Sequence, residues 1–564
     1  MEMPYSSNRC NPHRNMIVVN AGPDVTPSEF GVFAESSSLP GAADYGPGTS
    51  VDVLQDSMLM MGQSHAAASF QVASRTSMKL LEMPLQIDSS ADMSATSGMW
   101  TCTQHPLTTS TAGSSVNQQH SHLKRSTNEG NVLISCVSTG PGISMVKSGG
   151  GLLGMSQDAG CLEQLLVYCM TAIENNDATL AQQLVWVLNN TVSIEGDPNQ
   201  RVAAYFLRAL ISRAARLMSS FPGLYALPPH LQERGTLINS TRVLSAIELA
   251  GFVDLTPWHR FGFSASNGAI LGAAQGRHSI HIVDFSITHC MQWPTLIEAL
   301  SKCPHGPPRV RLTVHSARPH VPPLLNMSFE EVGMKLTAFA KSKKVPFQFN
   351  VLPQKITELT PSCVAVQDGE MLVINCQMRA RYISDEPTGA AADGGQLGGG
   401  VSSLRVQFMR WIREVQPDLV TFVDEDADMG SKDAVCRLKA AFNYLWIPYD
   451  AMDTFLPRES KQRMQYEGDI GSKIENIVAC EGEERVERPE SKEKWVHRLT
   501  TSSNLQTIQF SEAVVAEVKA MLEEHAAGWS LKKADAGDSL LLTWKGHNVV
   551  FAIACVPITT TSQS

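Results

Sequence analysis

Acidic residues stand at two places in this chain where an open α/β sheet would perform chemistry. Asp284 lies at the end of the short apolar run Ser279–Phe285, and four carboxylates within Asp424–Asp428 follow the run Leu419–Val423. Ligands of such sheets bind beyond the carboxyl ends of the strands. Asp284 could therefore bind a ribose or a substrate, and the acidic run could bind a cation such as Mg²⁺.

Structural roles for these residues compete with the chemical ones, and we favour them. Asp284 is expected to accept nearby backbone N–H groups and so fix the loop that follows it. Asp424–Asp428 departs from the calcium-loop pattern, because its glycine comes one residue late, at Gly430, and Val435 occupies the twelfth position. We therefore expect an exposed acidic loop there. His281 lies between two isoleucines and is expected to be a hydrogen-bonded core histidine.

The loop after the run that contains Asp284 argues against a nucleotide-type cofactor. Residues Phe285–Pro294 include no glycine, although such loops need glycine so that the backbone can approach the ligand. Bulky Ile287, His289 and Met291 would occupy the space instead. The chain also lacks a G-x-S-x-G elbow, an H-E-x-x-H motif and a phosphate loop. The sequence predicts no enzyme activity, no cofactor and no metal site.

Five short β-rich runs alternate with helical patterns and predict the fold class. The runs are Ser279–Phe285, Val310–Val314, Phe347–Val351, Met371–Cys376 and Leu419–Val423, and helical patterns intervene at Pro294–Leu300, Phe329–Lys341 and Val401–Val415. This alternation predicts a parallel, doubly wound α/β sheet. Ser539–Trp544 and Val549–Val556 are four residues apart and predict an antiparallel hairpin. The layout is that of a Rossmann-like, methyltransferase-type core.

Leucine-rich patterns precede the first run and predict helices. Apolar residues recur at helical spacing over residues 162–173 and again over 180–188. Asp197, Pro198 and Gln200 predict a capping box at the start of a third helix. The leucine-rich positions are candidates for binding a partner's helix, with ordinary core packing as the alternative: Leu162, Leu165, Leu166, Ile173, Leu184 and Leu188.

Composition separates a folded region from its flanks. Residues 1–154 are rich in Ser, Gly, Met and Thr, show no sustained period, and are expected to form a disordered N-terminal arm. Residues 384–403 are expected to form a flexible loop, and residues 559–564 a tail. Glu481–Lys494 mixes six acidic with four basic residues and is expected to be a solvated face.

Charge and cysteine usage exclude some protein classes. Lys+Arg total 45 against Asp+Glu 55, a net charge of −10, so the chain does not coat nucleic acid by charge alone. Its 12 cysteines include no C-x-x-C pair, which is typical of reduced thiols in the cytosol or nucleus. No apolar stretch reaches the length of a membrane span, so no membrane contact is expected.

His281-Ile282-Val283-Asp284-Phe285 resembles the VHIID motif of the plant GRAS-domain regulators, and the resemblance extends over about 400 residues. Gly196–Phe206 is similar to part of the family's first leucine-rich region, and Asn476–Gly482 with Arg485, Glu487 and Arg488 looks like its join into the C-terminal SAW region. The scarecrow-like branch looks most similar. One departure is Cys290, where the family usually places a glycine before Met291-Gln292-Trp293.

The resemblance implies a domain layout and an α-helical cap on the core. Residues 155–558 would form the GRAS domain. Its regions would be leucine repeat I at 161–231, the VHIID region at 250–315, leucine repeat II at 325–357, the PFYRE region at 366–477 and the SAW region at 480–557.

The resemblance also implies a nuclear transcription regulator that forms homo- or heterodimers and works through DNA-binding partners, zinc-finger proteins possibly among them. Direct DNA binding by a dimeric core is an alternative, and its candidate residues are Arg309, Arg311, Lys341, Lys343 and Lys344, although short basic runs often only solvate a helix end. A methyltransferase-like enzyme or small-molecule sensor is the third hypothesis.

Overall fold

The computed structural model describes residues 159–218, 243–319, 321–386, 402–534 and 537–558, all within one structural unit. The expected arm at 1–154, the tail at 559–564 and most of the expected loop at 384–403 lie outside the described residues. Within the described ranges, no helix has the length and apolar character needed to cross a membrane.

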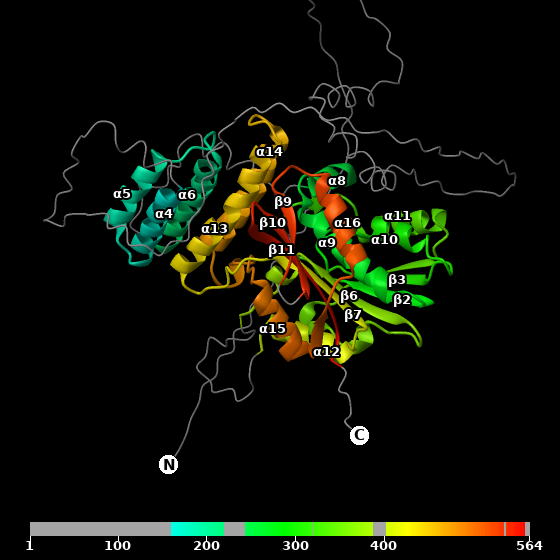
Figure 1. Ribbon diagram of the computed structural model, residues 1–564. Coiled ribbons are helices and arrows are strands. Elements are labelled where there is room, and N and C mark those ends of the chain that lie inside the picture. The colour runs from blue at the N-terminus through cyan, green and yellow to red at the C-terminus, as the bar shows by residue number, and fades with distance from the viewer. Residues whose placement is uncertain (1–158, 219–242, 320, 387–401, 535–536, 559–564) are drawn as a thin grey trace, which may run out of the picture. The chain divides into compact units, whose positions relative to one another are not determined.

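A nine-stranded mixed sheet forms the core of the described region (Figure 1). Its parallel strands are β2 (Ser279–Asp284), β3 (Arg309–His315), β5 (Phe347–Leu352), β6 (Met371–Gln377) and β7 (Leu419–Glu425), and its antiparallel strands are β8 (Leu505–Ile508), β9 (Trp529–Lys533), β10 (Ser539–Trp544) and β11 (His547–Pro557). The order is β5-β3-β2-β6-β7-β11-β10-β9, with β8 paired to β11. This confirms the methyltransferase-type Rossmann core and its five parallel strands.

The antiparallel part of the sheet is larger than expected. The predicted hairpin is present as β10 and β11, but its turn is Lys545-Gly546, where both residues have positive φ, of 47° and 88°. Such a two-residue turn matches the twist of the flanking strands better than the four-residue connection that we expected. Strands β8 and β9 were not predicted, because short strands with exposed polar residues show no apolar run.

Helices cover both faces of the sheet (Figure 1). One face packs against α9 (Pro257–Ala273), α10 (Trp293–Leu300), α11 (Phe329–Ser342) and α16 (Glu512–Glu523), and the other against α12 (Leu404–Val415) and α15 (Lys492–Ser503). Side chains of a strand alternate between the faces. In β2, Ile282 therefore joins the first apolar cluster and Val283 the second. Burial on both faces explains why the predicted runs are almost continuously apolar.

A second helical layer packs beside the sheet. It contains α4 (Ala159–Glu174), α5 (Ala178–Asn189), α6 (Pro198–Leu217), α13 (Ala434–Asp453) and α14 (Lys461–Ala479), with α6 packed against α4, α13 and α14. We call these five helices the cap. Helix α6 begins at the predicted capping box, in which the Asp197 side chain accepts from the Gln200 N–H and the Gln200 side chain accepts from the Asp197 N–H.

Short elements connect these layers. They are β1 (Val243–Leu244), which pairs with β4 (Leu324–Leu325), α8 (Ala246–Asp254), and the 3₁₀ turns η1 (Ile356–Glu358), η2 (Pro361–Cys363), η3 (Ala380–Tyr382) and η4 (Gly482–Glu484).

A glycine sets how closely two cap helices approach. Gly471 on α14 faces Tyr205 on α6, and a Cβ atom at Gly471 would overlap the tyrosine ring. The ring is itself buried and packs against Tyr449. A larger side chain at position 471 can therefore be accommodated only if the two helices move apart.

We expect Gly471→Ala to lower the free energy of unfolding by about 1–3 kcal/mol, because overpacking strains a closely packed helix pair. The matched control is Gly272→Ala in α9, where a Cβ atom meets open space. That variant should be as stable as the wild type or up to about 1 kcal/mol more stable, since alanine favours a helix. Denaturant unfolding of the full chains, monitored by circular dichroism, gives the free energy of unfolding of both variants. Equal stabilities of the two variants would contradict the close packing at Gly471.

Candidate functional site

The VHIID-like segment forms most of the central strand β2 and is buried along its whole length. His281 Nε2 lies 2.8 Å from the Thr313 hydroxyl, which confirms a hydrogen-bonded core histidine. Burial lowers the His281 pKa to about 4, with a further contribution from Arg311 that outweighs the opposite effect of Glu370. Phe285 packs in the second apolar cluster below the sheet. These side chains hold the strand in place and none is open to a substrate.

The Asp284 carboxylate accepts hydrogen bonds from groups that fix the loop after β2. One oxygen accepts from the Ser286 backbone N–H at 2.9 Å and from the Asn375 amide at 3.1 Å. The other accepts from the Trp293 indole N–H at 3.0 Å. The expectation that Asp284 accepts a neighbouring backbone N–H is thereby confirmed, and the indole bond also ties β2 to the start of α10.

A chain of buried amides continues from Asp284 across the ends of β2 and β6. The side-chain oxygen Oε1 of Gln292 accepts from the Asn375 side-chain amide at 3.0 Å and from the Gln377 side-chain amide at 2.7 Å. Thr421 on β7 donates to Asn375 at 2.7 Å. Strands β3 and β6 lie on opposite sides of β2, so this is the switch point where a sheet of this type binds its ligand. In this protein, hydrogen-bonded side chains fill it.

Sequence analysis did not single out Asn375, Gln377 or Thr421. Each of these residues is a polar side chain within or next to an apolar run, which could have indicated a special role. A central strand tolerates a buried polar group only when that group has a hydrogen-bond partner. That partner could not be named, because Asn375 lies 91 residues from Asp284 along the chain.

The acidic run Asp424–Asp428 is the exposed loop that we expected only at its end, where Asp428 is exposed. Asp424 and Glu425 are the last residues of β7 and are buried. The Arg381 guanidinium in η3 lies 3.1 Å from Asp424 Oδ1 and 2.7 Å from Glu425 Oε1. Lys473 of α14 also pairs with Glu425. Burial alone would raise the Glu425 pKa, but Arg381 and Lys473 hold it below its ordinary value, so this carboxylate stays ionised. Among the described residues, no cluster of His, Cys, Asp or Glu could hold a metal ion.

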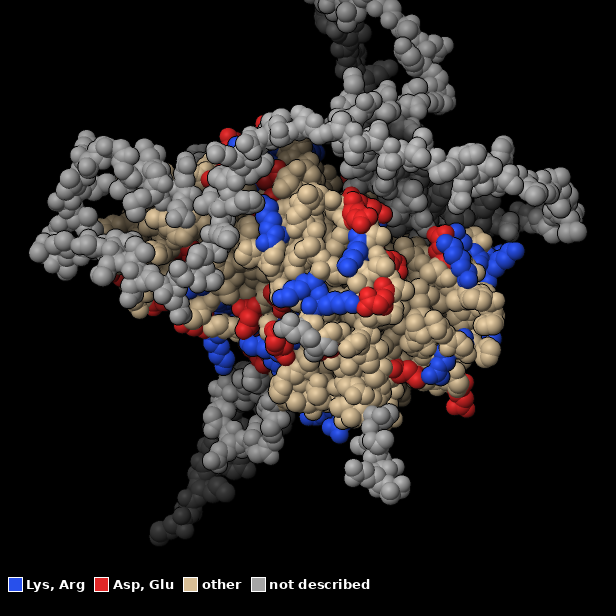
Figure 2. Space-filling view, in the orientation of Figure 1, with Lys and Arg blue, Asp and Glu red and all other residues tan. Residues whose placement is uncertain are grey.

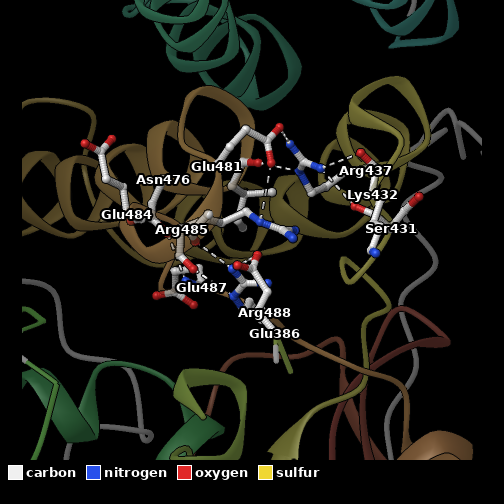
Figure 3. Close-up of polar contacts among 12 residues, drawn as sticks. Glu386, Ser431, Lys432, Arg437, Asn476, Glu481, Glu484, Arg485, Glu487 and Arg488 are labelled. Carbon is white, nitrogen blue, oxygen red and sulfur yellow. Dashed lines mark hydrogen bonds and ion pairs between the residues drawn. The ribbon is translucent and has the colours of Figure 1, made fainter. Parts of the chain in front are cut away.

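The expected solvated face at Glu481–Lys494 is also wrong for its central part. Arg485, Glu487, Arg488 and Glu490 are buried. In Figure 3, Arg488 points toward Glu386, which it meets at 2.6 Å, and it also pairs with Asp385 at 2.9 Å.

The same segment binds the cap through arginines of other elements. Arg437 of α13 pairs with Glu481 and donates to the Ser431 carbonyl at 2.8 Å (Figure 3). Arg213 of α6 also meets Glu481, at 2.9 Å. On the far side of the sheet, Arg405 of α12 meets Glu490 at 2.8 Å. We call residues 481–490 the charged linker, because its carboxylates contact both the cap and a sheet-covering helix; Glu481–Glu484 are exposed, whereas Glu487–Glu490 are buried.

Comparison with known proteins agrees with this architecture. The model of the GRAS domain family matches residues 162–554, a range that includes most of the cap, most of the sheet and the charged linker. The chain belongs to the GRAS domain family. Members of this family are plant transcriptional regulators.

Individual relatives cover the same part of the chain. Scarecrow-like protein 32 of Arabidopsis thaliana is 46% identical over 408 residues, which are 71% of this chain and 95% of that protein. Scarecrow-like transcription factor PAT1 of Arabidopsis thaliana is 30% identical over 394 residues, 69% of this chain and 75% of the relative. The crystal structure of SCL7 from Oryza sativa has 24% identity and a TM-score of 0.55, covering 70% of this chain and 99% of that one.

The leucine-rich positions of this GRAS domain lie mostly inside the cap. Leu162, Leu166, Ile173 and Leu188 are buried, and Leu165 and Leu184 are partly buried against the same cluster. The buried four cannot form a partner surface in this conformation, because their side chains already pack in the cap core. Other side chains of α4 and α5 are exposed instead, and the sequence did not distinguish them.

The basic candidates for DNA contact are separated by the fold. Arg311 is buried and pairs with Glu370, so it is not available to DNA, which corrects that assignment. Arg309, Lys341 and Lys344 are exposed. Lys343 caps the C-terminal end of α11 and lies 3.3 Å from Glu298, in keeping with a residue that solvates a helix end.

We expect Asp284→Asn to destabilise the GRAS domain by about 2–3 kcal/mol. The amide nitrogen of the asparagine would face N–H groups that now donate hydrogen bonds to the carboxylate, and it cannot accept them. Exposed Asp368 provides the control, and Asp368→Asn should leave the stability unchanged. Thermal unfolding of the full chains measures both. An Asp284→Asn protein of wild-type stability would contradict the loop-fixing role.

Acid should destabilise this GRAS domain through its buried histidines. His281 has a folded pKa of about 4 against 6.5 for the free side chain, so the unfolded chain binds a proton that the folded chain does not. Its contribution is present above pH 6.5 and falls by about 2 kcal/mol between pH 7 and pH 5. His281→Gln should lessen this loss, whereas His497→Gln, in the exposed part of α15, should not. The measurement is the free energy of unfolding of each variant at pH 7 and at pH 5. If the wild type and His281→Gln lost the same stability between these pH values, the assigned role of His281 would be wrong.

Proposed function

We propose that this protein is a nuclear transcription regulator that acts mainly through contacts with other proteins. It would serve as a co-regulator or adaptor for DNA-binding partners such as zinc-finger proteins, and it would form homo- or heterodimers with GRAS proteins. The observation that carries the proposal is on the cap. Three large apolar side chains of α4 and α5 are exposed: Tyr168 by 52%, Leu180 by 40% and Trp186 by 60%. Exposed tryptophan and tyrosine are typical anchors of protein interfaces.

The chemistry of the described residues supports binding over catalysis. The polar groups at the switch point bond to one another, and the carboxylates at the end of β7 are paired with Arg381 and Lys473. A reaction would need at least one of these groups to be open to substrate. Relatives named as transcription factors point in the same direction.

Surface charge supports partner-mediated contact with DNA. On the face drawn in Figure 2, Lys and Arg side chains are interspersed with Asp and Glu and form no continuous basic patch. The whole chain carries a net charge of −10. Because phosphate neutralisation supplies most of the non-specific affinity for DNA, a protein with this charge gains little of it. Direct DNA binding is the second candidate function, because three of the basic candidate residues, Arg309, Lys341 and Lys344, are exposed.

The first experiment selects random duplex DNA with the purified full chain at physiological salt. The adaptor role predicts that no sequence is enriched. Enrichment of a motif whose binding weakens steeply with salt, and is lost in Lys341→Gln/Lys344→Gln, would instead establish direct DNA reading.

The partner surface is tested by Trp186→Ser in a plant-cell assay that measures occupancy of target promoters by the full chain. Truncating an interface anchor costs about 2 kcal/mol, or roughly 30-fold in affinity, so occupancy should fall strongly. Met334→Ser removes a similarly exposed apolar side chain from α11 and should leave occupancy unchanged. Both variants should keep wild-type thermal stability. Equal occupancy for Trp186→Ser and wild type would contradict a partner surface on α5.

A further inference from the structure

A cavity of about 580 Å³ lies beyond the carboxyl ends of β2 and β3, between the loops that follow these strands and helix α14. Its walls are mainly apolar and include Trp258, Ile287, Leu325, Phe329, Tyr466 and Ile470. Cavities of this volume, apolar with a few polar groups, are typical of sites for small organic ligands. The cavity is separate from the polar chain around Asp284, because neither Asp284 nor Asn375 lines it.

One cation in the cavity wall has no anionic partner among the described residues. Arg318 lines the cavity, and its two terminal guanidinium nitrogens are buried without a hydrogen bond in the described part of the chain. Its Nε donates to the His315 carbonyl at 3.2 Å, and its guanidinium lies 4.9 Å from the centre of the Phe329 ring. These contacts orient the side chain, and the two terminal nitrogens have no oxygen acceptor within the described residues, so they can donate to a ligand.

The groups beside Arg318 do not neutralise it. Burial raises the pKa of the Cys290 thiol to about 12, so this neighbour stays uncharged and offers Arg318 only the weak hydrogen bond of a neutral thiol. Arg379 at the end of β6 adds positive charge, and burial lowers its pKa to about 10, with Arg318 lowering it further. By contrast, the other wall cations, Arg381 and Lys473, are already paired with Glu425.

Buried arginines that form no ion pair are rare in the described part of this protein. Among the buried arginines in the described ranges, Arg379 alone forms no ion pair with a described residue, while the others have carboxylate partners. A buried cation without a counter-ion is costly.

The cavity wall also contains the carboxylates Glu425, Glu487 and Asp469. Glu425 and Glu487 are paired with Arg381 and Lys473. No ion pair in the described ranges involves Arg318 or Arg379, and an anionic ligand beside Arg318 would compensate this charge.

Two neutral polar groups of the cavity wall also lack hydrogen-bond partners within the described residues. Thr288 Oγ1 and His259 Nδ1 are buried and have no hydrogen-bond partner within the described residues. Burial lowers the His259 pKa to about 4, so the ring is neutral at physiological pH. Both groups can bond a hydroxyl or carbonyl oxygen of a ligand, at positions distinct from the guanidinium.

We propose that this cavity binds a small, largely apolar organic monocarboxylic acid, with the carboxylate held by the Arg318 guanidinium and the apolar body lying against the wall of α14. A guanidinium presents two parallel N–H groups that match the two oxygens of a carboxylate. The apolar lining accounts for the rest of the ligand. Helices α13 and α14 of the cap form part of the wall, and most of the rest comes from loops after the strands and from α8, α9 and α11, so the bound acid contacts both layers.

The test is a fluorescence-anisotropy titration of the full chain with 1-pyrenebutyrate, compared with the uncharged 1-pyrenebutanol. We expect saturable binding of the acid that is at least about 10-fold tighter than binding of the alcohol, since a charge-assisted hydrogen bond is lost with the carboxylate. Decanoate and 2-naphthoate should displace the probe. Arg318→Gln should bring the affinity for the acid down to that for the alcohol.

Two further variants make the result specific. Arg309→Gln removes an exposed arginine from the opposite end of β3 and should leave binding unchanged. Ser472→Phe, in the cavity wall on α14, should abolish binding of the acid and the alcohol together, because the ring occupies the cavity while Arg318 remains. Circular dichroism verifies that each variant is folded. The proposal is overturned by absence of saturable acid binding, by equal affinities for acid and alcohol, or by equal weakening in Arg318→Gln and Arg309→Gln.

Discussion

The architecture depends on buried arginines that must meet carboxylates from distant parts of the chain. A guanidinium removed from water is tolerated only where a carboxylate and further hydrogen bonds compensate the lost hydration. The charged linker, residues 481–490, supplies three of those carboxylates, Glu481, Glu487 and Glu490. Through them it contacts the cap, the 3₁₀ turn η3 and helix α12. The cap and the sheet thus share one electrostatic network in addition to their apolar contacts.

The same sheet that binds cofactors in other proteins is closed here at its switch point. Asp284, Gln292 and Asn375 satisfy one another, and the loop that a cofactor would approach contains no glycine. His289 and Cys290 nevertheless adopt positive φ, of 52° and 65°, a conformation that favours glycine. At Cys290 the backbone thus has a conformation for which glycine is suited. The loop instead places Ile287, Thr288 and His289 in the wall of the cavity beside β3.

Much of the fold could be predicted because its signals are local. The five apolar runs, the Asp197 capping box and the terminal hairpin each depend on residues a few positions apart. Strands β8 and β9 were missed because an edge strand with polar residues carries no run of apolar side chains. At the candidate site, burial of His281 could be predicted from its two isoleucine neighbours. The burial of Asp424 and Arg488 could not, because their partners Arg381 and Asp385 lie 43 and 103 residues away.

Residues close together in the chain were sufficient to predict the alternation of strands and helices, the resemblance to the GRAS family and the absence of a glycine-rich cofactor loop. Periodicity and motifs depend only on such neighbouring residues. The tertiary structure decided which charges are solvated and which are buried, which leucines of the cap remain exposed, and that Arg318 faces a cavity without a described carboxylate partner. These outcomes depend on which distant side chains the fold brings within a few ångströms. Coulomb and desolvation energies are set by that distance and by burial, and neither can be read from sequence spacing.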